Sequence, residues 1–76
     1  MNRPWSPLKQ YDLRDEIFNK ALRAARLMRN QGQMTTLTYD VVFKSFYDSL
    51  QMQDIQASIE RLHEIISEYG IAVSHD

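Results

Sequence analysis

The sequence predicts an all-α protein: a compact three-helix domain of helix-turn-helix type, with an extended N-terminal arm and a short extended C-terminal tail. Apolar residues recur with the helical period in three separate segments. Gly32 and Gly70 follow the first and the last of these segments, where a glycine ends a helix at little conformational cost. A chain of 76 residues, of which 43% are hydrophobic and 25% charged, suits one small globular domain. We expect residues 1–11 to form the arm and residues 12–76 to form the domain.

The arm is predicted from its two prolines, Pro4 and Pro7. Proline fixes its own backbone and disfavours a helix in the residue before it, so this stretch is expected to be extended. Trp5, the single tryptophan of the chain, either folds back over one end of the core or docks on a partner.

The first helix is expected from Leu13 to Arg29, with Asp12 as its N-cap. Glu16 and Lys20 lie four residues apart, in the order that favours an ion pair on a helix. Lysine and arginine residues occupy the side opposite the apolar arc. The apolar arc consists of Ile17, Phe18, Ala21, Leu22, Ala25 and Met28.

The second helix is expected to begin at Thr38, a good N-cap, with Leu37 packing on Val42 as a hydrophobic staple. A strand is the competing interpretation, because Thr, Tyr, Val and Phe favour strands. Three consecutive apolar residues, 41–43, break the alternation that a half-buried strand requires, whereas the helical period continues for twelve residues. The predicted apolar stripe is Tyr39, Val42, Phe43, Phe46, Tyr47 and Leu50.

The third helix follows a short turn over residues 51–54. Gly70 is expected to end it, with Ile71 contacting Ile66 in a Schellman-type stop, and residues 71–73 are expected to be extended. Its predicted apolar face, with Ile65 at the edge, consists of Met52, Ile55, Ile59, Leu62, Ile66 and Tyr69.

The order of these elements resembles region 1.1, the N-terminal domain of bacterial primary sigma factors. The resemblance rests on Gly32, Leu37-Thr38-Tyr39, Ile65-Ile66 and Gly70-Ile71-Ala72-Val73, and it covers about residues 20–74. It implies a small helical fold and a role in transcription, since that acidic domain occupies the DNA channel of RNA polymerase as a nucleic-acid mimic. The basic first helix of this chain departs from the acidic pattern of the family.

No pattern of a catalytic or metal site is present. The chain has no cysteine, its two glycines form no phosphate loop, and neither His63 nor His75 has a second ligand at metal-binding spacing. We expect His63 to be a boundary or surface residue, and the chain to need no cofactor and catalyse no reaction. Without a long apolar run or a signal-peptide pattern, the expected location is the cytoplasm.

The net charge of −1 conceals a division along the chain. Residues 1–30 contain seven basic and three acidic residues, whereas residues 31–76 contain two basic and seven acidic ones. Glutamates repeat every four residues in the third helix, where neighbouring like charges repel. Either arginines of the first helix pair with these glutamates inside the fold, or the acidic face meets a basic partner. The predicted partner-binding residues are Gln56, Glu60, Glu64, Ser67 and Glu68.

The leading hypothesis is therefore a non-catalytic module that binds a protein, either RNA polymerase or a DNA-binding regulator. Two alternatives stay open. One is a helix-turn-helix regulator that binds DNA through the arm and the basic residues of the first helix, and the other is a homodimer in which the basic face of one chain meets the acidic face of the other. The candidate nucleic-acid-binding residues are Lys20, Arg23, Arg26 and Arg29.

Overall fold

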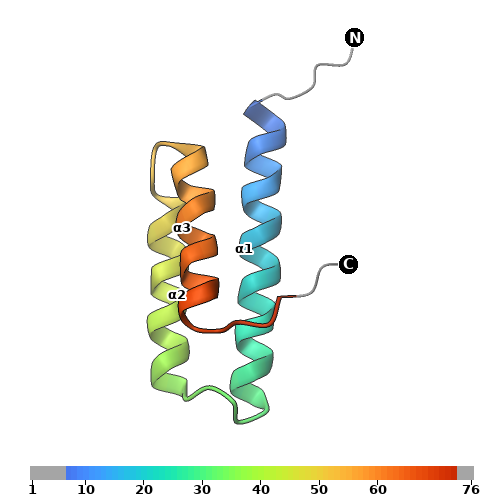
Figure 1. Ribbon diagram of the computed structural model, residues 1–76, viewed down its shortest axis with the longest axis vertical. Helices are drawn as coiled ribbons and strands as arrows, with labels where there is room; N and C mark the ends of the chain where they lie inside the picture. The colour runs from blue at the N-terminus through green and yellow to red at the C-terminus, as the bar shows by residue number, and fades with distance from the viewer. Residues whose placement is uncertain (1–6, 74–76) are drawn as a thin grey trace.

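Three α-helices make up the described part of the chain. The structure, a computed structural model, describes residues 7–73, and side chains for residues 12–73. Helix α1 spans Pro7–Asn30, α2 spans Thr36–Leu50 and α3 spans Ile55–Glu68, with no strand anywhere in residues 7–73. Each helix contacts the other two, and the three run along the long axis of the molecule (Figure 1). The prediction of an all-α three-helix domain is confirmed.

The N-terminal end of α1 differs from the prediction. The helix begins at Pro7, so the extended arm predicted over residues 1–11 is wrong for residues 7–11, and Asp12 lies inside the helix instead of capping it. The first residue of a helix needs no N–H donor, so at this position the fixed φ of proline favours the helix. Trp5 belongs to residues 1–6, which lie outside the described residues.

Helices α1 and α3 end in the same way, at the two glycines. Gly32 has a φ of 77° and Gly70 a φ of 60°, the left-handed region that glycine enters at least cost. After α3, the N–H of Ile71 donates to the carbonyl oxygen of Ile66 at 3.0 Å, and the corresponding bond after α1 is 2.8 Å. These are the hydrogen bonds of a Schellman motif, so both predicted helix stops are confirmed.

Helix α2 begins three residues before the predicted position. Thr35 is the N-cap, and its hydroxyl oxygen accepts a hydrogen bond from the N–H of Thr38 at 3.1 Å. The N′ and N4 positions of this cap are Met34 and Tyr39, both buried, whereas Leu37 is 76% exposed. Thr38 as N-cap and Leu37 as staple were therefore wrong: the segment offers several threonines, and burial of Met34 selects the earlier one.

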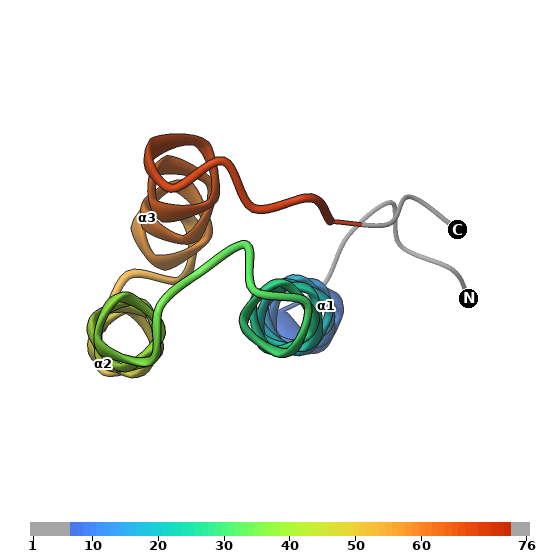
Figure 2. The same cartoon turned by 90° about the horizontal axis from the view of Figure 1, so that it is seen from below.

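Helices α2 and α3 form a hairpin. The turn over residues 51–54 joins them as predicted, and Asp54 caps α3 by accepting a hydrogen bond from the N–H of Ala57 at 3.2 Å. Figure 1 shows the two helices side by side and antiparallel, which is the arrangement of a helical hairpin. Beyond α3, residues 71–73 leave the helix toward α1 (Figure 2).

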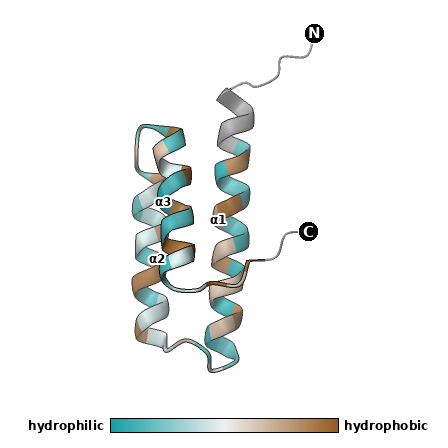
Figure 3. Ribbon diagram, in the orientation of Figure 1, coloured by the Kyte–Doolittle hydropathy of each residue, from teal (hydrophilic) through white to brown (hydrophobic). Residues whose placement is uncertain are grey.

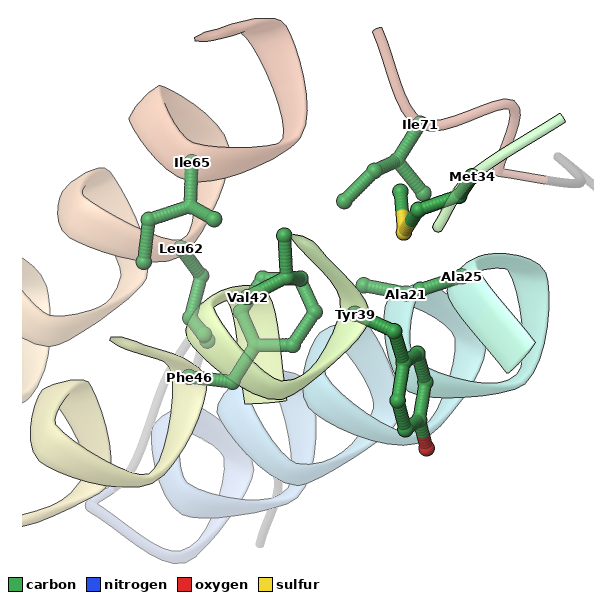
Figure 4. Packing of buried hydrophobic residues seen from close by; sticks show 9 residues of the cluster. All are labelled: Ala21, Ala25, Met34, Tyr39, Val42, Phe46, Leu62, Ile65 and Ile71. Carbon is green, nitrogen blue, oxygen red and sulfur yellow. The ribbon is translucent and has the colours of Figure 1, made fainter. Parts of the chain in front are cut away.

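The core lies where the three helices meet, and Figure 3 shows apolar and polar residues interspersed along each helix. Ile65, predicted at the edge of the third apolar face, is fully buried, whereas Met52, predicted within that face, is 39% exposed. The buried cluster, drawn in Figure 4, consists of Ala21, Ala25, Met34, Tyr39, Val42, Phe46, Leu62, Ile65 and Ile71. Since its members come from all three helices and the tail, this cluster fixes which side of each helix faces solvent.

Candidate interaction surface on helix α3

Helix α3 is oriented by its buried side. Leu62 and Ile65 have no exposed surface, and Ile59 is nearly buried. Side chains three and four residues apart share one face of a helix, so burying these residues turns the opposite face outward. The exposed residues of that face are Gln56, Glu60, His63, Glu64, Ser67 and Glu68.

Part of this face is a shallow depression of about 550 Å³, lined by Glu60, His63, Glu64, Ser67 and Glu68. The structure thus brings together four of the five predicted partner-binding residues, and the fifth, Gln56, is exposed one turn before Glu60. His63 is exposed, as expected, but its part in the surface was missed. Its spacing of three residues from Glu60 and four from Ser67 is the signal that places it there.

Glu60, Glu64 and Glu68 form what we call the glutamate ridge, one carboxylate per turn. Glu64 pairs with Arg61 of the same helix, with Nη1 and Oε1 separated by 3.1 Å. Each neighbouring pair in the ridge repels by about 0.2–0.5 kcal/mol. Glu68 also lies in the last turn, where the helix dipole disfavours negative charge. The ridge therefore lowers the stability of the helix that carries it.

Arg23, Arg26 and Arg29 of α1 do not neutralise the ridge. In the part of the chain with described side chains, no salt bridge joins Arg23, Arg26 or Arg29 to a glutamate of the ridge. The interpretation that these three arginines pair with the ridge inside the fold is therefore wrong. Ion pairs with these arginines therefore do not account for the ridge.

The four basic candidates of α1 do not form one surface. Lys20 pairs with Glu16 at 3.5 Å, as predicted, and the Arg29 guanidinium lies 4.4 Å from the centre of the Tyr39 ring on α2. Arg23 and Arg26 are exposed. Since only these two project into solvent away from an ion pair or ring contact, the cationic surface is smaller than the sequence suggests.

The exposed face of α3 is suited to bind cationic groups. Ionised carboxylates only accept hydrogen bonds, so the ridge is complementary to lysine and arginine side chains. Within the described residues, no group of three or more His, Cys, Asp or Glu side chains is placed so that it could hold a metal ion, and no helix combines the length and apolarity needed to cross a membrane.

Comparison of this chain with family models, with curated proteins and with solved structures gives no match. The resemblance to region 1.1 of primary sigma factors therefore stays a prediction from the residues that carry it.

Proposed function

We propose that this chain is a small, non-catalytic interaction module of the bacterial cytoplasm that binds a basic protein surface through the glutamate ridge. The partner is RNA polymerase or a DNA-binding regulator. One observation carries the proposal: three exposed carboxylates repeat along α3, and only Glu64 has a salt bridge within the described residues. Repulsion between neighbouring carboxylates and the position of Glu68 in the last turn oppose folding, which supports a role in binding for this arrangement.

The identity of the partner class rests on charge and on the resemblance to region 1.1. A surface that binds DNA offers lysine and arginine side chains. In the proposed complex, these side chains of the partner would contact the carboxylates of the ridge instead of DNA phosphates. Regular spacing of carboxylates along one helix face imitates a short row of phosphates. This is the recognition that a domain like region 1.1 would use inside a polymerase channel.

The DNA-binding alternative has weaker support. Arg61 is the only basic residue of α3 and already pairs with Glu64, so the ridge would be repelled by a phosphate backbone. On α1, Arg23 and Arg26 remain as exposed cations. The charge-paired homodimer stays open as a third arrangement, since the two charged faces lie on different helices.

Charge reversal tests the proposal. We expect the triple substitution Glu60→Lys, Glu64→Lys and Glu68→Lys to abolish capture of RNA polymerase subunits or DNA-binding regulators from a bacterial lysate by the immobilised protein. Mass spectrometry measures the captured proteins, and circular dichroism verifies that the helices persist. Capture at the wild-type level by the triple variant would refute the proposal.

A matched control reverses three acids of α1 instead, Asp12, Asp15 and Glu16, all of them exposed. This variant changes the net charge by the same amount on another helix, and it should retain capture. Fluorescence anisotropy with a labelled DNA duplex at about 150 mM salt decides the alternative. Tight binding there, weakened by Arg23→Ala and Arg26→Ala, would favour the DNA-binding regulator.

A further inference from the structure

Two apolar side chains of α2 face solvent where a small domain would be expected to bury them. Leu37 is 76% exposed and Val41 is 46% exposed, and they lie four residues apart on the same side of the helix. Single exposed leucines are common on protein surfaces, so the surroundings of this pair decide whether it has a role.

The pair lies on the side of α2 that, nearer the hairpin turn, lines a groove between α2 and α3. This groove, of about 320 Å³, is lined by Ser45, Asp48, Ser49 and Met52 of the α2 end and by Arg61 of α3. Val41 lies four residues before Ser45, and Leu37 four residues before Val41, so both belong to the side of α2 that lines this groove. The exposed apolar pair therefore lies further along the same side of α2, beyond the residues that line the groove.

The hydrogen bond between Ser49 and Ser58 shows which residues of α3 lie opposite that pair. The helices are antiparallel and rise equally per residue, so moving eight residues back from Ser49 to Val41 corresponds to moving eight residues on from Ser58 to Ile66. Glu64 and Glu68 flank Ile66 in the sequence. Val41 is therefore level with the second half of the glutamate ridge.

The two glutamates also lie toward the groove side of α3. The Arg61 side chain lines the groove, Glu64 pairs with it at 3.1 Å, and Glu68 follows Arg61 by seven residues, two helical turns. Leu37 and Val41 thus lie on the side of α2, and Glu64 and Glu68 on the side of α3, that flank the groove between the two helices. We call these four residues the acidic–apolar face.

We infer that the acidic–apolar face binds a basic amphipathic helix of a partner protein, whose apolar side chains pack on Leu37 and Val41 while its lysines or arginines meet Glu64 and Glu68. The inference rests on the proposed function and specifies the partner's chemistry. Charge complementarity selects a basic segment, and the two apolar residues select one with an apolar stripe. A groove between two antiparallel helices accommodates a third helix through residues spaced by three and four.

The glutamates and the apolar pair contribute to binding in different ways, so the acidic–apolar face needs both. Exposed ion pairs contribute little affinity and mainly speed and orient the encounter, whereas affinity comes from apolar side chains that lose water at the centre of an interface. The ridge alone would attract many cationic proteins without selecting among them. The apolar pair supplies the selection.

Two fluorescent peptides of about 16 residues, long enough to form a helix, test the inference. Both have the same lysine, arginine and leucine content, but only one places its leucines at helical spacing. Fluorescence anisotropy on the full chain should show the amphipathic peptide binding about tenfold more tightly than the scrambled one, the equivalent of about 1.4 kcal/mol. The double variant Leu37→Ser, Val41→Ser should remove this preference and leave the weaker, salt-dependent binding that both peptides share.

Leu27→Ser is the matched control, because Leu27 is a 55% exposed leucine of α1 and its loss should leave the preference intact. Chemical-shift mapping on the wild-type chain gives a measurement that requires no variant. Amides of residues 37–41 and 64–68 should shift with the amphipathic peptide, and shifts confined to other regions would overturn the inference.

The failures of the two proposals are distinguishable. Equal affinity for both peptides, or a preference that survives in the Leu37/Val41 variant, would refute the role of Leu37 and Val41 in binding. Neither outcome would contradict the proposed function. Undiminished capture by the Glu60/Glu64/Glu68 variant would refute the proposed function itself. A sedimentation mass of twice 9.0 kDa that Leu37→Ser reduces to one chain would show that a second copy covers this face, and would overturn the external partner.

Discussion

The hydroxyl of Ser58 in α3 donates a 2.6 Å hydrogen bond to the main-chain carbonyl oxygen of Ser49 in α2. Both serines are buried, and the carbonyl, in the last turn of α2, also accepts a hydrogen bond from the N–H of Met52 at 3.2 Å. The Ser49 hydroxyl in turn donates to the carbonyl oxygen of Ser45 at 2.9 Å. This polar contact thus stabilises the hairpin of α2 and α3, whose second helix carries the glutamate ridge.

We expect Ser58→Ala to lower the free energy of unfolding by about 1 kcal/mol, because a buried hydrogen bond is lost while alanine gains some helix propensity. Ser67→Ala, on the exposed face of the same helix, measures the propensity gain alone. Urea unfolding of both variants gives the difference between them. Equal stabilities would mean that the Ser58 hydroxyl contributes nothing to the hairpin.

The N-cap of α2 gives a second prediction. Thr35→Ala should cost about 1 kcal/mol of unfolding free energy, because the N–H of Thr38 loses its acceptor. Thr38→Ala keeps that cap and should change stability by less than about 0.5 kcal/mol. Thermal or urea unfolding checks both, and a larger loss in Thr38→Ala would restore the cap position suggested by the sequence.

Backbone conformation governs the third prediction. Gly70→Ala should destabilise the domain by about 1–2 kcal/mol, because alanine resists a φ of 60°. A Cβ at this position meets no atom within 4 Å, so the cost is conformational and not steric. Gly70→Asn should cost less, since asparagine tolerates this region better. Equal losses in the two variants would contradict a backbone origin.

The glutamate ridge gives the fourth prediction, and here the substitution should stabilise. Glu68→Lys removes repulsion from Glu64 and places a positive charge in the last turn of α3, which together should add about 0.5–1 kcal/mol at low salt. The gain should shrink as salt screens both terms. If unfolding experiments showed a loss of stability instead, the ridge would have a favourable role in folding that its geometry does not reveal.

Local chemistry explains the parts of the fold and of the candidate surface that were predictable. The helical period set three helices, and the two glycines set both Schellman stops, because few other residues adopt a positive φ. The ridge followed from spacing alone, since Glu60, Glu64 and Glu68 must share a face on any helix.

Tertiary structure decided the features for which local signals compete. Thr35 and Thr38 are similar caps by type, and burial of Met34 chose between them. Ile65 and Ile66 are the same residue type, so the sequence does not distinguish them. The side of α3 that packs against the other two helices places Ile65 in the core and leaves Ile66 at its margin. Proline has opposite effects at the start and in the middle of a helix, so Pro7 could be assigned only once the start of α1 was known.

By itself, the sequence determined the number of helices, where two of them stop, and the division of charge between the two parts of the chain. Only the tertiary structure decided that the arginines Arg23, Arg26 and Arg29 form no salt bridge with the glutamate ridge, and that Leu37 and Val41 face solvent. The physical reason is that periodicity and φ preferences act within a few residues, whereas the direction in which a helix face points depends on how all three helices share one small core.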